Sequence, residues 1–278
     1  MNRDLLKSKG WRFASCFNDG VAALLCERIQ GDHRIDNCFY INVTQDCSII
    51  NPNIDAEPFI EYLTAIPIPK ENGMFINARN IRKLHIEIDV NGQVGWYELN
   101  MGLRGFISRE NIDGCDPSLG IKLTPESERI LKRWLANRYI AQTFPDDFNA
   151  KINHLLKNSK APLVKIFDSD IGRACHSILI SLDPNDRDLE KGESYDVVLV
   201  LLFSEAKAKE IGFDAMDFLA NEVEKTLINI DGIGPVSVNS LSESSITFEQ
   251  VVKMVRWQFD YISLANDAQI VPIEHASI

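Results

Sequence analysis

The chain has 278 residues, a length that allows one large domain or two domains of ordinary size. Its apolar fraction of 45% supplies enough material for hydrophobic cores and excludes global disorder. The net charge of −11 argues against a general affinity for nucleic acid, because contact with phosphates needs a positive surface.

The charge is unevenly distributed along the chain. Residues 1–69 carry a net charge of −3, residues 70–160 a net charge of +3 and residues 161–278 a net charge of −11. A contact with nucleic acid would therefore use the middle third. The acidic last third would suit a basic protein partner.

The sequence predicts a cytoplasmic protein that does not enter a membrane. The N-terminal stretch MNRDLLKSKGWRF has no continuous apolar segment of the kind that secretory signals contain. The longest strongly apolar run, Val197 to Phe203, is too short to span a bilayer. The six cysteines form no CxxC pair, and reduced thiols are the simplest account of them.

Residues 10–112 are predicted to form a β-rich, barrel-like domain. Short apolar runs separated by Gly, Asn, Asp and Pro are typical of strands. The runs are Val21–Ile29, Phe39–Val43, Phe59–Ile68, Leu84–Val90, Val94–Leu99 and Phe106–Ile107.

The stretch HIEIDVNGQVGWYEL predicts a β-hairpin with a defined register. Asn91-Gly92 is a favoured pair for a type I′ turn, because both central positions of that turn have positive φ angles. Closing the turn there pairs Val90 with Gln93. Counting outward gives an apolar face with Ile86 opposite Tyr97 and Leu84 opposite Leu99, and a polar face with His85 opposite Glu98 and Glu87 opposite Trp96.

After this hairpin the spacing of the apolar residues changes from one typical of strands to one typical of helices. Thr124 is a good N-cap and Pro125 suits the first helical position, so a helix is expected from there. Pro145 interrupts the pattern, and a second helix is predicted over Asp146–Leu156. The stretch Asn158–Pro162 has the composition of a linker, which places a domain boundary near residue 160.

The last third is predicted to be an acidic α+β domain. Strands are expected at Leu163–Phe167, Ser177–Leu182 and Tyr195–Phe203 and within GIGPVSVNSL, with helices over Asp214–Leu227 and from Thr247 through Phe259. The order suggests an α+β sandwich, with a ferredoxin-like arrangement as one form. The predicted layout is therefore residues 1–120 as a barrel-like domain, 121–160 as a helical bridge and 161–278 as the α+β domain.

The loop around Cys47 is the first candidate site. A nucleophilic cysteine needs a nearby base, and the base needs an acceptor that orients it. The hairpin offers His85 with Glu98 across from it, so Cys47, His85 and Glu98 would form a thiol–imidazole–carboxylate set if the loop approached that face. The plainer interpretation is a buried cysteine and an exposed cross-strand pair.

The sequence offers candidate ligands for two kinds of metal site, and neither site is predicted. Structural zinc sites usually contain a close pair of ligands, which the candidates lack: Cys16, Cys26, His33, Cys38 and Cys47. The acidic residues near the same loop could bind Mg²⁺ for a nuclease, with Asp46 as the leading ligand beside Asp55, Glu57 and Glu61. Asp and Asn also gather in turns for backbone reasons alone, and that interpretation is favoured. No cofactor is expected.

A basic set in the middle third is the remaining candidate site. Its members lie between residues 79 and 138 among aromatic residues that could stack on bases, and the leading ones are Arg79, Arg82, Lys83, Lys132 and Arg133. The alternative is a solvated helix face stabilised by ion pairs such as Glu128 with Lys132. That alternative is favoured.

Three stretches resemble a group of uncharacterised bacterial proteins, some of which are encoded near mobile elements and phage-defence genes. They are TQDCSIINP, RWLANRYIAQTFPDDFN and RWQFDYISL, and the first is similar to a QDCDI-N-P signature of that group. Ser48 stands where the signature has an acidic residue. The resemblance implies a bacterial, cytoplasmic setting and no particular activity.

Three functions follow as expectations. The first is an accessory or adaptor protein with a protein partner, in a mobile-element or phage-defence system. The second is an enzyme, either a hydrolase that uses Cys47 and His85 or a nuclease that uses the Asp46 loop. The third is a nucleic-acid-binding protein that uses residues 79–138.

Overall fold

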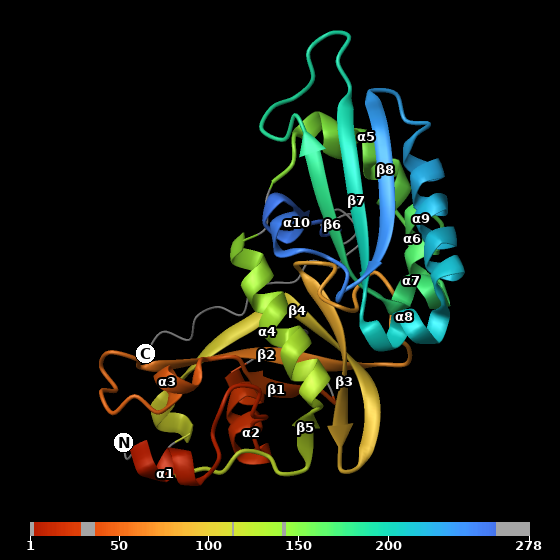
Figure 1. Cartoon of the computed structure of the whole chain (residues 1–278). Coiled ribbons are helices and arrows are strands. Elements are labelled where there is room, and N and C mark those ends of the chain that lie inside the picture. Colours follow the sequence, from red (N-terminus) through yellow and green to blue (C-terminus); the bar gives the residue numbers. More distant parts are fainter. Residues whose placement is uncertain (1–2, 29–36, 113, 141–142, 260–278) are drawn as a thin grey trace. The chain divides into compact units, whose positions relative to one another are not determined.

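The computed structural model of the protein describes residues 3–28, 37–112, 114–140 and 143–259 (Figure 1). It contains both helices and sheets, which confirms the α+β class. The described residues group in two compact units. Unit 1 holds residues 3–71 and 82–132, and unit 2 holds residues 72–81 and 133–259. The sequence-based boundaries near residues 120 and 160 do not coincide with these divisions.

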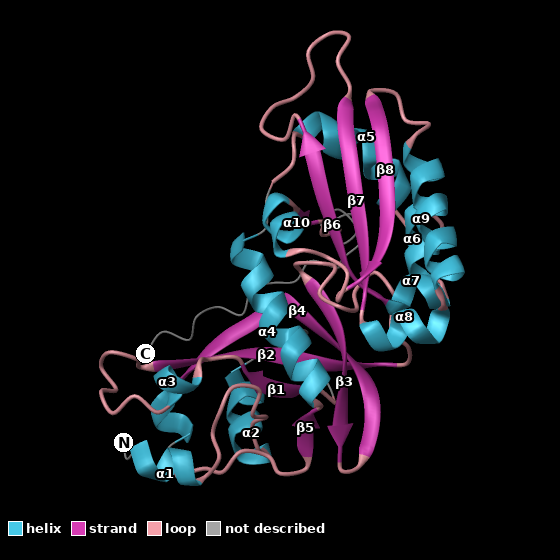
Figure 2. Ribbon diagram, in the orientation of Figure 1, coloured by secondary structure: helices cyan, strands magenta, loops and turns pink. Residues whose placement is uncertain are grey.

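Unit 1 is built around a five-stranded antiparallel sheet that curls into a half-barrel (Figure 2). The strand order is β1-β2-β4-β3-β5, with the bounds β1 Phe39–Asn42, β2 Phe59–Ile68, β4 Gln93–Ser108, β3 Lys83–Val90 and β5 Ile121–Leu123. The two runs predicted as separate strands, Val94–Leu99 and Phe106–Ile107, belong to the single long strand β4. The barrel-like character is confirmed in this half-barrel form.

The predicted hairpin register is confirmed. In the pairing of β3 with β4, Val90 lies opposite Gln93, His85 opposite Glu98 and Leu84 opposite Leu99. Asn91 and Gly92 both have positive φ angles, as the type I′ turn requires. Leu84, Ile86 and Leu99 are buried on the apolar face.

Short helices complete unit 1, and one of them corrects the sequence analysis. They are α1 (Arg3–Ser8), α2 (Asp19–Arg28), α3 (Asp46–Ile49) and the 3-10 turn η2 (Arg109–Ile112). The run Val21–Ile29 was predicted as a strand, but residues through Arg28 form α2. Val21 and Leu25, four residues apart, are both buried, and Asn18 Oδ1 accepts a hydrogen bond from Val21 N at the start of the helix.

The division between the units falls within helix α4 (Pro125–Ile140), between Lys132 and Arg133. The helix begins as predicted, because Thr124 Oγ1 accepts a hydrogen bond from Ser127 N at 3.1 Å. Ser127, Leu131, Trp134 and Asn137 are all buried and follow helical spacing, so they form one continuous buried stripe.

Unit 2 contains a four-stranded mixed sheet in the order β8-β7-β6-β9. Strand β6 (Cys175–Asp183) is antiparallel to β7 (Tyr195–Phe203) and to β9 (Val255–Arg256), whereas β8 (Ile233–Ser242) is parallel to β7. The helices are α5 (Asp146–Leu156), α6 (Pro162–Asp168), α7 (Asp170–Ala174), α8 (Glu205–Ile211), α9 (Phe213–Leu227) and α10 (Phe248–Lys253). The element order is not the β-α-β-β-α-β order of the ferredoxin-like motif.

The main core of unit 2 joins one face of this sheet to helices α5, α6 and α9. A smaller apolar cluster of Leu179, Val200 and Leu202, with Met254 packed against it, lies apart from that core. Leu179 belongs to β6, and Val200 and Leu202 to β7. This smaller cluster positions the site described below.

Two predictions for unit 2 are wrong. The run Leu163–Phe167 is helix α6 and not a strand, since Pro162 occupies the first turn and the buried residues Leu163, Val164 and Phe167 follow helical spacing. The helix expected to reach Phe259 ends at Lys253. Beyond it Val255 and Arg256 pair with β6, so tertiary pairing overrides the helical pattern.

Candidate functional site

Cys47 lies in α3 of unit 1 and is exposed. Its thiol has one hydrogen-bonding contact among the described residues, at 3.7 Å from Gln45 Oε1. The neighbouring Asp46 is a structural residue, because its Oδ1 accepts a hydrogen bond from Phe13 N at 2.5 Å. The start of the Cys47 loop is therefore bound to the N-terminal segment through Asp46 and Phe13.

A fully buried arginine holds the rest of this loop in place. Arg109 donates from Nη2 to Ile49 O at 2.9 Å and to Asn51 O at 2.5 Å, and from Nη1 to Glu57 O at 2.9 Å. Three backbone carbonyls of the loop thus converge on one guanidinium. Arg109 therefore stabilises the conformation of this loop by donating hydrogen bonds to its backbone carbonyl groups.

The predicted pair of His85 and Glu98 forms. His85 Nε2 lies 3.1 Å from Glu98 Oε2, and Lys83 Nζ lies 3.7 Å from Glu98 Oε1. Burial alone would raise the pKa of Glu98, but the hydrogen bond from His85 and the charge of Lys83 outweigh burial and lower it. His85 is buried rather than exposed, with 6% of its surface accessible.

Cys47 does not join this pair. Cys47 follows β1, His85 lies on β3, and two strands separate β1 from β3 in the sheet. The contact that the thiol makes is with Gln45, and it includes neither His85 nor Glu98. The structure therefore assembles the imidazole–carboxylate half of the predicted catalytic set without its nucleophile.

No metal site is present in the described part of the chain, where no three His, Cys, Asp or Glu side chains gather as a ligand set. Of the acidic residues near the Cys47 loop, Glu61 pairs with Arg104 at 3.2 Å and Glu57 accepts a hydrogen bond from Ser48. Burial raises the pKa of the Cys16 thiol to about 12. The side chain of Cys26 and residue His33 lie outside the described residues.

Arg79, a leading member of the predicted nucleic-acid site, is buried in unit 2. Its guanidinium donates to four backbone carbonyls, those of Gly73, Phe167, Gly172 and Cys175, and lies over the Phe167 ring. Burial lowers the pKa of Arg79. This arginine fastens the segment 72–81 to α6 and β6 and cannot reach a phosphate.

The other basic residues of this set are divided between the two units, and three of them have polar contacts of their own. Lys83 pairs with Glu98, and Lys132 pairs with Glu128 at 2.7 Å. Arg133 donates to Asn77 O at 3.1 Å. Arg82, Lys83 and Lys132 belong to unit 1, whereas Arg79 and Arg133 belong to unit 2.

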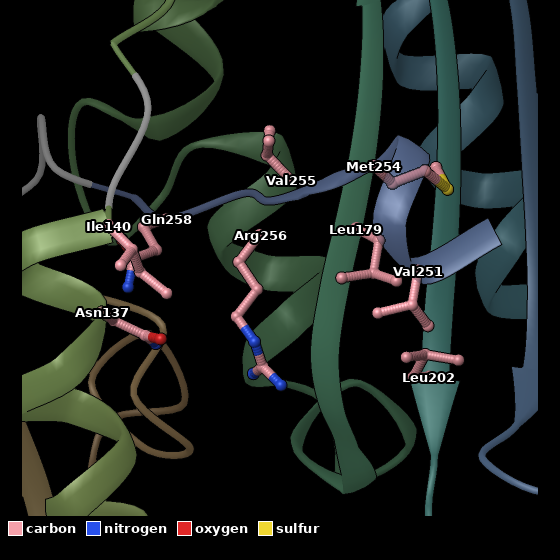
Figure 3. Close-up of a pocket in the computed structure, with 9 residues that line it drawn as sticks. All are labelled: Asn137, Ile140, Leu179, Leu202, Val251, Met254, Val255, Arg256 and Gln258. Carbon is pink, nitrogen blue, oxygen red and sulfur yellow. The ribbon is translucent and has the colours of Figure 1, made fainter. Parts of the chain in front are cut away.

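A pocket of about 330 Å³ lies in unit 2, against the smaller apolar cluster (Figure 3). Its apolar walls come from the end of α4, from β6 and β7, and from α10 with the residues that follow it; they are Ile140, Leu179, Leu202, Val251, Met254 and Val255. Three polar residues line the same pocket: Asn137, Arg256 and Gln258. None of the predicted site residues lies here.

Asn137 contributes a buried donor that has no acceptor. The side chain is 3% exposed, and its Nδ2 has no hydrogen-bond partner among the described residues. The amide projects from α4 toward the side of the pocket where Arg256 lies (Figure 3). A buried donor left without a partner costs stability, so its presence here needs an explanation.

Arg256 is held beside β6 by a serine. Its Nη1 donates to Ser177 Oγ at 2.7 Å, and burial lowers the pKa of Arg256. Ser177 in turn lies 2.9 Å from His176 Nδ1. Burial, and then the charge of Arg133, lowers the pKa of His176 to about 4, which keeps this imidazole neutral at pH 7.

The sequence held a weak signal for this pocket. Asn137 falls on the buried stripe of α4, three residues after Trp134, where an apolar residue would be expected. Arg256 likewise interrupts an apolar stretch. Neither residue could be connected to the other from the sequence alone, since they are distant along the chain and meet through the fold.

Comparison with known protein families, with curated proteins and with solved structures gives no match to this chain. Within the described residues, no helix has both the length and the apolar character that crossing a bilayer requires. The chemistry of the pocket residues therefore carries the functional conclusion.

Proposed function

We propose that the protein is a binding protein for a small molecule and that the pocket of unit 2 is its binding site. The observation that carries the proposal is that Asn137, a residue lining the pocket, has a buried Nδ2 without an acceptor among the described residues. Leaving such a donor unpaired costs about 1–3 kcal/mol. A ligand that supplies an acceptor would remove this cost.

The composition of the pocket supports the proposal. Small-molecule sites are mostly apolar and carry a few polar groups that orient the ligand. Here six apolar residues form the walls, and Asn137, Arg256 and Gln258 provide the polar groups. A dry apolar cavity of about 150 Å³ accommodates benzene. A pocket of about 330 Å³ would therefore hold a ligand on the order of a dozen non-hydrogen atoms.

Of the functions expected from the sequence, the accessory role agrees better with a ligand-binding pocket than catalysis at Cys47 does. The pocket is lined by Val251 of α10, by Met254 and by Arg256 of β9, and also by residues of the sheet strands β6 and β7. A bound ligand would contact both α10 and the sheet and would hold them together. An adaptor whose surface at α10 responds to a small molecule is the form of that role that we propose.

Three eight-carbon probes test the proposal: octanoate, octanamide and octylammonium. Isothermal titration calorimetry should show that the protein binds at least one of them at one site per chain. Val251, which lines the pocket and is 39% exposed, can be enlarged to block it, so Val251→Trp should abolish binding. Val252, its neighbour on α10, is 65% exposed and does not line the pocket.

Val252→Trp is therefore the matched control and should bind as the unmodified chain does. The proposal is contradicted if none of the three probes binds. It is also contradicted if Val251→Trp and Val252→Trp bind equally well.

A further inference from the structure

The charges that line the pocket have one sign. Of its nine described lining residues, Arg256 is the charged one, and none is Asp or Glu. Among the described residues, the Arg256 guanidinium has one hydrogen-bond acceptor, the neutral Ser177 Oγ. A cation that is partly withdrawn from water is unfavourable unless a negative charge compensates it.

Two fully buried arginines, Arg79 and Arg109, show how this chain compensates such a group elsewhere. Arg79 donates to four backbone carbonyls and Arg109 to three. Arg256 donates to one acceptor, the hydroxyl of Ser177. A guanidinium carries five N–H donors, so donors of Arg256 remain for a ligand in the pocket.

The donors are arranged for a planar anion with a single charge. An arginine can bind a carboxylate through two parallel hydrogen bonds, and Asn137, which lines the same pocket, carries a further, neutral donor in its Nδ2. The imidazole of His176, which lies beside Ser177, is neutral at pH 7 and adds no second positive charge. A doubly charged group such as a phosphate would leave an excess negative charge against apolar walls.

We infer that the ligand is a monocarboxylate with an apolar body, that Arg256 binds its carboxylate group and that Asn137 donates to the same group. This inference rests on the proposed function of the same pocket. Ser177 is a positioning residue, because its hydroxyl fixes the guanidinium beside β6. Leu179, Leu202 and Met254 contact the apolar body of the ligand.

The three probes share one alkyl chain and differ in charge, so they isolate the role of Arg256. At pH 7 octanoate should bind at least about tenfold more tightly than octanamide, and octylammonium should bind more weakly than both, because Arg256 attracts only the anion. In Arg256→Gln the preference of octanoate over octanamide should fall to about onefold, whereas Arg256→Lys should keep part of it.

Arg187→Gln is the matched control, since Arg187 is an exposed arginine that pairs with Glu193 and does not line the pocket. Its octanoate affinity should be unchanged. The inference is overturned if octanamide binds as tightly as octanoate, or if Arg256→Gln keeps the preference. In those cases binding blocked by Val251→Trp would still support a neutral-ligand pocket, whereas a lack of binding by all three probes would overturn both proposals.

Discussion

At the scale of single residues, the informative feature of this protein is how its buried polar groups are satisfied. The terminal nitrogens of Arg79 and Arg109 donate to several backbone carbonyls, and both residues serve the fold. Asn149 is a buried amide whose Nδ2 donates to Phe144 O at 3.0 Å. Asn137 has an equally buried amide whose Nδ2 has no acceptor within the described residues. Two asparagines of similar burial therefore differ in the role that we expect.

Asn137→Leu should separate stability from binding. Removing a buried donor that has no partner should leave the free energy of unfolding unchanged or raise it by about 1 kcal/mol. The same substitution should weaken octanoate binding at least about fivefold, because a donor to the carboxylate is lost. Urea unfolding followed by circular dichroism and calorimetric titration measure the two effects.

Asn149→Leu provides the control for this prediction. It removes a satisfied amide and should destabilise the protein by about 1–2 kcal/mol without changing octanoate affinity. If Asn137→Leu destabilises the protein as much as Asn149→Leu, the Asn137 amide has a structural partner and no ligand role.

At the scale of elements, short apolar runs did not distinguish a strand from a helix, whereas turn residues predicted the local structure correctly. The hairpin of β3 and β4 was predicted with its register because Asn91-Gly92 defines the turn and the alternation defines the faces. The runs at Val21 and Leu163 were predicted as strands and are helices. A run of five to nine apolar residues fits a buried strand or a buried helix equally well, and packing decides between them.

Helix α10 depends on its cap rather than on burial. Thr247 and Gln250 form a complete capping box, and no residue of the helix is buried. Thr247→Ala should therefore destabilise α10 by about 1 kcal/mol. Since α10 carries Val251 and leads to Met254 and Arg256, we expect octanoate affinity to fall several-fold and hydrogen exchange of residues 248–253 to accelerate.

Ser204→Ala is the comparison for this prediction. Ser204 caps α8, where its Oγ accepts a hydrogen bond from Lys207 N, and α8 does not line the pocket. It should cost a similar free energy while octanoate affinity stays the same. Equal losses of affinity in both variants would show that the pocket responds to general destabilisation and not to α10.

At the scale of the whole molecule, segments distant in the sequence complete unit 2. Its core includes Met74 from the segment 72–81 and Phe148, Ile152, Leu155 and Leu156 from α5. Arg79 from the same segment binds carbonyls of α6, α7 and the start of β6. The acidic last third predicted as a domain, residues 161–278, lacks Arg79, Met74 and the four residues of α5.

The isolated fragment 161–278 should therefore fail to fold. Burial of one large apolar side chain contributes about 1.5–3 kcal/mol, so losing the four from α5 removes roughly 6–12 kcal/mol, comparable to the stability of a whole domain. We expect the fragment to show no cooperative urea transition and no near-UV circular dichroism, in contrast to the full chain. A cooperative transition with native-like near-UV signal would contradict this and would support the boundary near residue 160.

The sequence by itself determined those features in which a few neighbouring residues specify the backbone. These are the hairpin register at Asn91-Gly92, the start of α4 at Thr124, helix α5 after Pro145 and the capping box at Thr247. Turn and cap preferences are local and can be read without the fold. The pairing of His85 with Glu98 followed directly from that register.

Only the tertiary structure decided which polar residues are functional candidates. Arg79 was a candidate for a surface site, but it is buried and donates to four carbonyls. Cys47 was a candidate nucleophile beside His85, but its thiol contacts Gln45. Arg256 was not among the candidate residues and lines the pocket. The pocket draws its residues from α4, β6, β7, α10 and β9, which no local pattern connects. Whether a buried charge is satisfied depends on groups that arrive from elsewhere in the chain, so this property first exists when the chain has folded.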